Sequence, residues 1–402
     1  MIKTVNMLSE ETFNEASKPE FIKSEGKYTI KSKAGVPYSA GMYTTCCAAT
    51  DNCDKLLKIS IPYEASGERV SPRALVSFVG KEELLIQSDY FTKENGVFTL
   101  KKEIPEGTEN IKLEMLFYCF GKGEVTFGEP IIEITSKEPH RIVRVASGFI
   151  EKKGNFEDNF KSTLKIIEEA ALSPEKPDIL CFTECVLDVG CKDKLFIHES
   201  GEEMQKVCEA VKKAGMYVIF TSHEIDDDGY KYNTSFLTSD KGEVVGKYRK
   251  VFLTGMGEIK NSGLTPGSEF PVFDTPLGKI GMIICWDNWF PEATREMAKK
   301  GAEMVFWSTR GFHEERPVTR AMDNGVYFIV SHSNPKNCGI IEPAWGKYLA
   351  RADGTKEQGF VSAVIDLDER LNSQYKSFGK NGSNDREVFI TESDLFYKII
   401  KK

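Results

Sequence analysis

The kind of secondary structure that the sequence predicts changes near residue 140. Upstream of that point, short apolar runs are separated by turn residues, and no convincing helical period follows the first twenty or so residues. In the run 110–120, Ile111, Leu113, Met115 and Phe117 alternate with polar or smaller residues, as in a half-buried strand. Repeated strands with turns predict a β-sandwich. Further strand-like runs lie at 55–65, 73–80, 96–104 and 124–134.

Downstream of residue 140, predicted strands alternate with predicted helices. The helix expected at 158–172 has apolar residues at helical spacing, and Asp158 or Asn159 is placed to be its N-cap. The next expected helix ends at Gly215. Strand–helix alternation at this spacing predicts an α/β layered domain. The first four elements are expected at 141–150 (strand), 158–172 (helix), 177–184 (strand) and 202–215 (helix).

The length and net charge of the chain limit the number of domains and the kinds of partner that can be expected. Its 402 residues fit two or three domains, and the change of pattern divides them into a β-sandwich accessory domain, 1–138, and an α/β domain, 139–402. The chain has 53 Lys+Arg against 61 Asp+Glu, a net charge of −8, so nucleic acid is not expected as a partner. The N-terminal sequence lacks the apolar run of a signal peptide, and no apolar stretch reaches the roughly 18 residues of a membrane span. A cytoplasmic protein without a membrane partner is therefore expected.

The ten cysteines predict neither a disulfide scaffold nor a metal site. They are too sparse for a small secreted scaffold, and several lie inside apolar runs, where cysteine is a small core residue. No Cys-x-x-Cys pair occurs, and the five histidines never fall at paired ligand spacing. A zinc site is not expected.

One cysteine lies at a predicted strand-to-helix corner. In GKIGMIICWDNWFPEATREM the strand ends at Cys285, and Pro291 opens a helix, where its missing N–H costs nothing. A thiol at such a corner can have backbone N–H groups beside it, which suits a nucleophile with an oxyanion site. Taken alone, Cys285 is also compatible with a buried cysteine at a strand end.

Two charged residues lie near the ends of other predicted strands. Glu184 follows the apolar run 177–183, where an unused charge would be costly. Lys250 lies among the alternating residues of 241–253. In isolation, Glu184 is compatible with a solvated carboxylate and Lys250 with a surface lysine.

Together, Glu184, Lys250 and Cys285 resemble the Glu–Lys–Cys set of the nitrilase superfamily, the carbon–nitrogen hydrolases. The matching motifs are ILCFTE, GKYRKVFL and ICWDNWFPE, supported by YNTSFLTSDKG, RAMDNGVYFIV and VSAVIDLDE. They occur in the family's order and cover nearly all of 141–370. The resemblance implies a four-layer αββα sandwich and a homodimer or higher homo-oligomer.

The resemblance also implies roles for the site residues. Cys285 would attack an amide or nitrile carbon while Glu184 acts as general base, and no metal or organic cofactor would be needed. Lys250 and the backbone N–H of Trp286 would stabilise the oxyanion. Glu258 matches a second family glutamate beside the lysine and the base, with a loop carboxylate as the alternative. If the two glutamates are adjacent, they are expected to share protons, with the pKa of one raised.

The residues around Cys285 narrow the expected substrate class. CWDNWFPEATR is closest to the N-carbamoyl-amide branch, so we expect an amidase or N-carbamoyl-amide hydrolase that releases ammonia, rather than a nitrilase. Arg310 is a hypothetical contact for a carboxylate or polar end of the substrate, or else a surface arginine. Thr309 and Tyr232 are predicted to bind substrate together with Trp286 and Arg310.

Other functions stay open. The same acyl-enzyme could transfer its acyl group to an amine, or the chain could be a non-catalytic binding or scaffold protein. A Cys/His hydrolase using His313 or His332 is a further alternative, although neither histidine has a flanking signature.

The N-terminal domain has its own resemblance. Residues 98–134 resemble the last strands of galactose-binding-like, carbohydrate-binding jelly rolls. Because all four tryptophans lie in the second half of the chain, we favour a lid, an oligomer contact or a positioning role over carbohydrate capture. The tyrosines at 38, 43 and 90 are the alternative aromatic platform.

Overall fold

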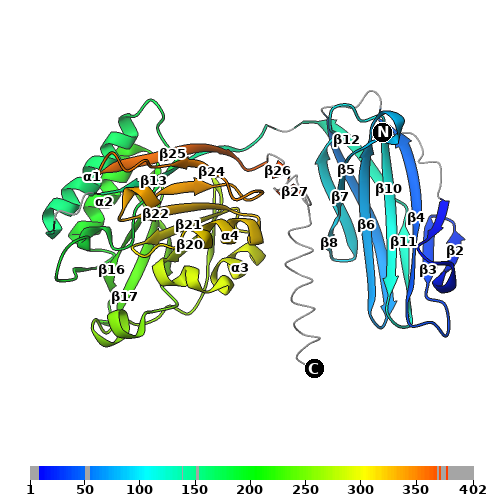
Figure 1. Ribbon diagram of the computed structural model, residues 1–402, viewed down its shortest axis with the longest axis horizontal. Helices are drawn as coiled ribbons and strands as arrows, with labels where there is room; N and C mark the ends of the chain where they lie inside the picture. The colour runs from blue at the N-terminus through cyan, green and yellow to red at the C-terminus, as the bar shows by residue number, and fades with distance from the viewer. Residues whose placement is uncertain are drawn as a thin grey trace. The chain divides into compact units, whose positions relative to one another are not determined.

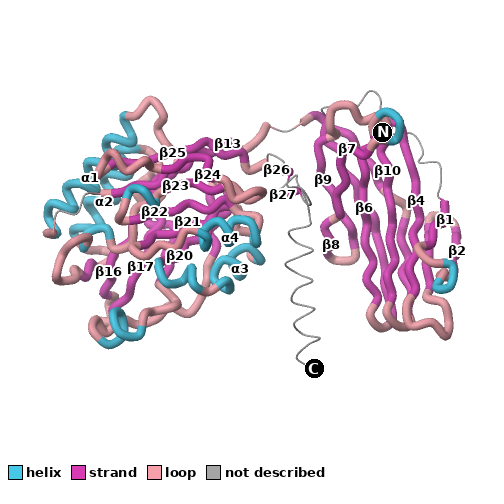
Figure 2. Tube along the Cα trace, in the orientation of Figure 1, coloured by secondary structure: helices cyan, strands magenta, loops and turns pink. Residues whose placement is uncertain are grey.

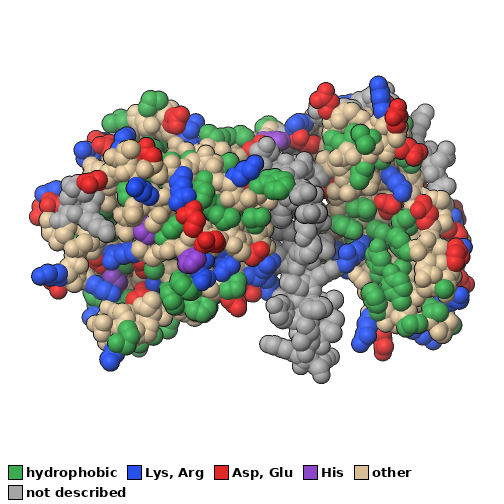
Figure 3. All heavy atoms as spheres, viewed as in Figure 1, with side chains coloured by type: hydrophobic (Ala, Val, Ile, Leu, Met, Phe, Trp, Pro, Cys, Tyr) green, Lys and Arg blue, Asp and Glu red, His purple; other side chains and the backbone are tan. Residues whose placement is uncertain are grey.

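The chain divides into two compact units, with the boundary between Pro139 and His140. The computed structural model describes residues 9–49, 55–137, 139–150, 154–368, 371–372 and 377–378 (Figure 1). Within these ranges, no helix has both the length and the apolar character needed to cross a membrane. On the face shown in Figure 3, basic and acidic side chains are interspersed over each unit.

The first unit consists of two antiparallel sheets around one core (Figure 2). One sheet has the order β1-β4-β10-β6-β7; the other has the order β2-β3-β11-β5-β9-β8, with β12 paired to β5. Ile111, Leu113, Met115 and Phe117 of β10 are all buried in this core, as their alternation predicts. The strands are β1 (Ser9–Thr12), β2 (Glu20–Ser24), β3 (Lys27–Lys31), β4 (Ser39–Ala48), β5 (Lys55–Gly67), β6 (Val70–Val79), β7 (Leu85–Tyr90), β8 (Thr92–Glu94), β9 (Val97–Glu103), β10 (Asn110–Cys119), β11 (Gly123–Gly128) and β12 (Ile131–Ser136).

The strand-like run 124–134 is divided in the structure. Strand β11 ends at Gly128 and β12 begins at Ile131, and both pair with the long strand β5. Pro130 lies between them, and proline cannot donate a ladder hydrogen bond. The run therefore supplies two strands to one sheet.

The second unit has four layers, with two sheets face to face between pairs of helices (Figure 1). Helices α1 and α2 share a core with the first sheet, whereas α3 contacts β20 and α4 contacts β22 of the second. This is the αββα order that the family resemblance implies. The first sheet is β18-β17-β16-β14-β13-β25, with β15 paired to β16, and the second is β19-β20-β21-β22-β23-β24. The bounds are β13 (Ile142–Phe149), α1 (Phe156–Leu172), β14 (Ile179–Cys181), β15 (Phe196–Ile197), α2 (Glu202–Ala214), β16 (Tyr217–Ile225), β17 (Lys231–Thr238), β18 (Val244–Arg249), β19 (Val272–Thr275), β20 (Gly278–Ile284), α3 (Pro291–Lys299), β21 (Met304–Thr309), α4 (Glu315–Asn324), β22 (Tyr327–His332), β23 (Gly339–Ile341), β24 (Tyr348–Arg351) and β25 (Gly359–Asp366). The short strands β26 (Leu371–Asn372) and β27 (Ser377–Phe378) follow β25 in the chain.

The start of α1 differs from the prediction. Its N-cap is Asn155, whose side chain accepts a hydrogen bond from the Asp158 N–H at 2.9 Å. Asp158 and Asn159 were wrong as caps because both lie inside the first turn. Asn159 is buried and donates instead to the carbonyls of Leu187 and Val189.

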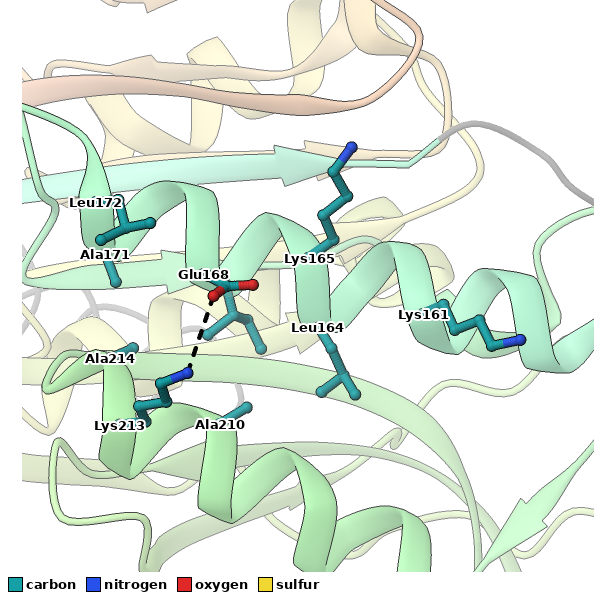
Figure 4. Close-up of a pocket in the computed structure, with 10 residues that line it drawn as sticks. Lys161, Leu164, Lys165, Glu168, Ala171, Leu172, Ala210, Lys213 and Ala214 are labelled. Atoms are coloured by element: carbon teal, nitrogen blue, oxygen red, sulfur yellow. Dashed lines mark ion pairs between the residues drawn. The ribbon is translucent and has the colours of Figure 1, made fainter.

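A shallow groove runs between α1 and α2 on the outer face of the first sheet (Figure 4). Leu164, Leu172 and Ala210 contribute apolar surface to it. Across the groove, Lys213 of α2 forms an ion pair of 3.9 Å with Glu168 of α1. The two helices are thus joined by packing in their shared core and by an ion pair across the groove.

Hydroxyl groups join the two sheets of the second unit across its interior. The O–H groups donate to backbone carbonyls on the facing sheet, so the interface is hydrogen-bonded as well as packed. Because β14 and β21 are joined in this way, the segments that follow them leave the sheets side by side. The bonds run from Ser308 to the Phe182 carbonyl (2.8 Å), from Ser331 to the Cys181 carbonyl (2.9 Å), from Thr183 to the Thr309 carbonyl (2.7 Å) and from Ser147 to the Val330 carbonyl.

Replacing the hydroxyl of Ser308 tests the contribution of these bonds. Ser308 also accepts from Thr221 at 3.0 Å, so Ser308→Ala removes two buried hydrogen bonds at once. We expect the free energy of unfolding of the second unit to fall by about 1–3 kcal/mol in denaturant titration. The exposed control Thr319→Ala should change it by no more than about 0.5 kcal/mol. Equal effects of the two substitutions would contradict a structural role for the inter-sheet hydroxyls.

Candidate active site

A buried ammonium lies between two buried carboxylates. Lys250 Nζ is 3.2 Å from Glu184 Oε1 and 2.8 and 2.9 Å from the two carboxylate oxygens of Glu258. Lys250 is 1% exposed, and the two glutamates are 6% and 7% exposed. Three segments of the second unit therefore each place one charged side chain in the same cluster. These segments are the chain after β14, the chain directly after β18, and the turn 255–260.

Asn233 of β17 connects the same two carboxylates. Its Nδ2 donates to Glu184 Oε1 at 2.9 Å and to Glu258 Oε1 at 3.0 Å. Its carbonyl accepts from the Lys250 N–H at 2.9 Å. Asn233 was not predicted as a site residue, although it lies within the YNTS motif. Since neighbouring residues of a strand point to opposite faces, only one of Tyr232 and Asn233 can point to the cluster.

Cys285 lies at the corner that the sequence predicts. Strand β20 ends at Ile284, and Cys285 begins a single turn with a left-handed φ of +43°. Such backbone strain in a non-glycine residue often marks a functional position. Its sulfur lies within electrostatic reach of the Glu184 carboxylate, the Lys250 ammonium, the Thr309 side chain and the Arg310 backbone, each of which shifts the pKa of the thiol. The thiol, a carboxylate and an ammonium therefore converge on one point.

The corner is held by a carboxylate that the sequence analysis did not single out. Asp287 accepts from the backbone N–H of Ile284 and of Phe252, both at 2.9 Å, and from the Tyr248 hydroxyl at 2.7 Å. Burial raises the pKa of Asp287 to about 6, although Lys250 and these donors oppose the rise. The carboxylate fixes the loop after Lys250 to the turn that carries Cys285.

The charges of the cluster set the resting protonation of the thiol and of the base. Burial and the Glu184 carboxylate raise the pKa of Cys285 to about 11, despite Lys250 and the hydrogen bonds. Burial alone would raise the pKa of Glu184, but Lys250, Arg310 and hydrogen bonds from Cys285 and Asn233 lower it to about 2. The expectation of a raised carboxyl pKa was therefore wrong for Glu184, because an ammonium lies between the two glutamates.

The predicted substrate-binding residues have different surroundings. The Thr309 side chain and the Arg310 backbone lower the pKa of the thiol, while the Arg310 guanidinium donates to the carbonyls of Glu184 (3.1 Å) and Cys185 (2.6 Å). The Trp286 ring stacks on Trp289, with centroids 4.6 Å apart. The structure does not bring Tyr232 to the cluster: its ring lies under the guanidinium of Arg249, 3.6 Å away.

The histidines considered as partners of a thiol have other contacts. His313 pairs with Glu315 at 2.7 Å, and His332 Nδ1 accepts from the Asn334 N–H at 2.7 Å. A different Cys/His contact exists, between Cys185 and His223. The spacing of histidines in the sequence gave no sign of it, because β14 and β16 bring the two residues together.

Comparisons with known proteins find the following similarities. The sequence profile of the carbon-nitrogen hydrolases matches residues 142–372. The chain is 33% identical over 276 residues to nitrilase homolog 2 of Dictyostelium discoideum, covering 62% of this chain and 80% of that protein. It is 32% identical over 237 residues to the omega-amidase NIT2 of Homo sapiens, covering 52% and 83%. A crystal structure of Saccharomyces cerevisiae Nit3, a member of branch 10 of the nitrilase superfamily, superposes with a TM-score of 0.49 at 21% identity, covering 56% of this chain and 90% of that one.

The resting state of the thiol can be measured directly. Because the pKa of Cys285 is raised to about 11, the 240 nm thiolate absorbance assigned to Cys285 should be absent at neutral pH and should rise only above about pH 9. We expect this in the difference between wild type and Cys285→Ser, in which the other cysteines and the tyrosines cancel. A thiolate signal already complete at pH 7 would contradict this assignment.

Proposed function

The chain belongs to the carbon-nitrogen hydrolase family, and we propose that it hydrolyses linear amides or N-carbamoyl amides through a thioester on Cys285. One observation carries the proposal: the Cys285 thiol lies near enough to an ionised carboxylate for each group to shift the other's pKa, with an ammonium 3.2 Å from that carboxylate. This is the combination of nucleophile, base and cation that acyl transfer from nitrogen requires.

The first half-reaction uses the thiol and the base as they stand at rest. As sulfur attacks the carbonyl carbon, its proton passes to Glu184, which is already ionised. The negative charge that develops on oxygen is stabilised by Lys250 and by the backbone N–H of Trp286. Glu184 then gives the proton to the leaving nitrogen, the C–N bond breaks, and ammonia leaves.

The second half-reaction reuses Glu184. The carboxylate takes a proton from water, the hydroxide oxygen attacks the thioester carbon, and the C–S bond breaks. The proton held by Glu184 returns to the sulfur and restores the resting thiol. Each step moves one proton between Glu184 and a neighbouring atom, so the chain's own residues account for the chemistry.

Glu258 orients the ammonium in this proposal. Both its oxygens accept from Lys250 Nζ, and Oε2 also accepts from the Thr254 N–H at 2.8 Å and the Thr254 hydroxyl at 3.1 Å. A carboxylate fixed by the backbone holds the lysine where it can reach both the base and a nascent oxyanion. The role is positional, since Glu258 reaches the reaction through Lys250.

The surroundings of Arg310 favour a different role from substrate capture. Its guanidinium is engaged by the carbonyls of Glu184 and Cys185, and its charge helps to lower the pKa of Glu184. We therefore assign it to anchoring the backbone of the base. This leaves the stacked rings of Trp286 and Trp289 as the apolar surface nearest Cys285 in sequence, and Trp289 is 44% exposed.

We also propose that residues 139–402 form the catalytic domain and that 1–138 form an accessory, jelly-roll-like domain. The two antiparallel sheets with one core support the second part. A lid, an oligomer contact or a positioning role is favoured over sugar binding; a glycan array probed with the full chain would separate these. The homo-oligomeric state and a cytoplasmic location remain predictions, and light scattering tests the first.

Removing the nucleophile or the base tests the amidase proposal. Cys285→Ala should abolish ammonia release from a panel of primary amides and carbamoylated amines, and should lose the acyl adduct seen by intact mass. Glu184→Gln should lower kcat by about 10²–10⁴-fold while the fold is kept. The conservative control Asp274→Asn alters an exposed carboxylate in the same unit and should leave kcat unchanged. Survival of ammonia release in both site variants would overturn the assignment.

The anchoring role of Arg310 predicts a specific pattern. Arg310→Met should lower kcat by about 10–10²-fold, because the base is no longer held in place. The ratio of kcat/KM between neutral and carboxylated amides should stay within about threefold of the wild-type ratio, since the guanidinium is already occupied. A selective loss of carboxylated substrates would show that the side chain binds substrate after all.

A further inference from the structure

A second set of reactive side chains lies directly behind the base. Cys185, Asp188 and His223 have ligand-type atoms within 4.8 Å of one another and are 2–3% exposed. Cys185 follows Glu184 in the chain and has a left-handed φ of +42°. The reaction described above uses none of these three side chains.

The set continues into the active site through Asn233. His223 Nδ1 is hydrogen-bonded to Asp188 Oδ2, and His223 Nε2 is 3.6 Å from Cys185 Sγ. The same sulfur is 3.4 Å from Asn233 Oδ1. Asp188 is fixed in turn by the Leu195 N–H at 3.1 Å. A chain of contacts therefore runs from Asp188 to the amide that connects Glu184 and Glu258.

A metal ion explains this arrangement less well than hydrogen bonding does. His223 already uses Nδ1 on Asp188, so only its Nε2 and the Cys185 sulfur are turned toward each other. A structural zinc takes four protein ligands, and within the described part of the chain this set offers two facing donors. The distances of 3.4 and 3.6 Å are those of hydrogen bonds that involve sulfur.

The orientation of the Asn233 amide is what the chain can control. The oxygen and nitrogen ends of an amide have nearly the same shape, so packing alone does not distinguish them. In the observed orientation, Nδ2 faces two carboxylate oxygens, and the reversed orientation would place an oxygen against both. The Cys185 thiol can donate a hydrogen bond to Oδ1, and this bond favours the observed orientation of the amide.

Resting on the amidase function proposed above, we propose that Cys185, held by His223 and Asp188, is a positioning residue. It fixes the amide of Asn233 and, through that amide, the Glu184 carboxylate beside Cys285. Cys185 touches no reacting atom in this arrangement. Its effect should therefore appear in kcat and should depend on Asn233.

Two substitutions at Cys185 separate hydrogen bonding from packing. Cys185→Ala removes the donor and should lower kcat by about 10–10²-fold with KM changed by no more than about threefold. Cys185→Ser keeps a donor to Asn233, and it should recover most of that loss. Cys338→Ala removes another buried thiol of the same unit and should leave kcat unchanged.

A readout that needs no turnover separates failure of this inference from failure of the amidase proposal. The rate at which iodoacetamide alkylates Cys285 at pH 7, followed on its peptide by mass spectrometry, reports how well Glu184 accepts the thiol proton. It should fall in Cys185→Ala and recover in Cys185→Ser. Ammonia release from wild type tests the amidase function on its own.

A double-mutant cycle tests the route through Asn233. If Cys185 acts through that amide, Cys185→Ala added to Asn233→Ala should change kcat and the alkylation rate by less than about twofold. Independent, multiplicative effects would overturn the inference, as would wild-type kcat and alkylation in Cys185→Ala or the lack of recovery in Cys185→Ser. If Asn233→Ala fails to fold by near-UV circular dichroism, the alanine–serine comparison decides alone.

Discussion

The ammonium of Lys250 is the interaction on which the site depends. Glu184 and Glu258 are both buried, and each lies 3.2 Å or less from this ammonium. Without the ammonium, the two carboxylates could not both remain charged, because an unpaired buried charge is costly. Arg310 adds a second cation near Glu184, so two carboxylates are matched by two cations. Each partner comes from a different segment, and the cluster consequently requires the whole second unit to be folded.

The protonation states explain how a buried thiol can be both stable and reactive. The pKa of Cys285 is raised and that of Glu184 is lowered, so the resting enzyme holds a neutral thiol beside a charged acceptor. A base with so low a pKa is weak. In the proposed reaction, however, the oxyanion would attract the Lys250 charge that lowers the Glu184 pKa, and the carboxylate would become more basic as the proton arrives. The cation thus couples proton transfer to bond formation.

The sequence was sufficient for the elements with strong periodicity and for the residues with unusual positions. The alternation in β10 and the strand–helix order after residue 140 follow from burial patterns that any single strand or helix must satisfy. Glu184, Lys250 and Cys285 were identified because the motifs around them, taken in order, resemble the nitrilase superfamily; taken alone, each was compatible with an ordinary structural residue. The cap of α1 and the roles of Asn233, Asp287 and Cys185 were not predictable in the same way. Each depends on a partner from a distant segment, and no local pattern records which residue of β17 points to Glu184.

The hydroxyl bonds between the two sheets of the second unit have a consequence for how the enzyme can fail. Glu184 follows β14 of the first sheet, and Thr309, which influences the pKa of Cys285, ends β21 of the second; bonds from Thr183 and Ser308 join these two segments. A slide of one sheet over the other by a fraction of an ångström would preserve both hydrophobic cores while separating sulfur from carboxylate. Substitutions in this interior would thus abolish turnover well before they unfolded the protein.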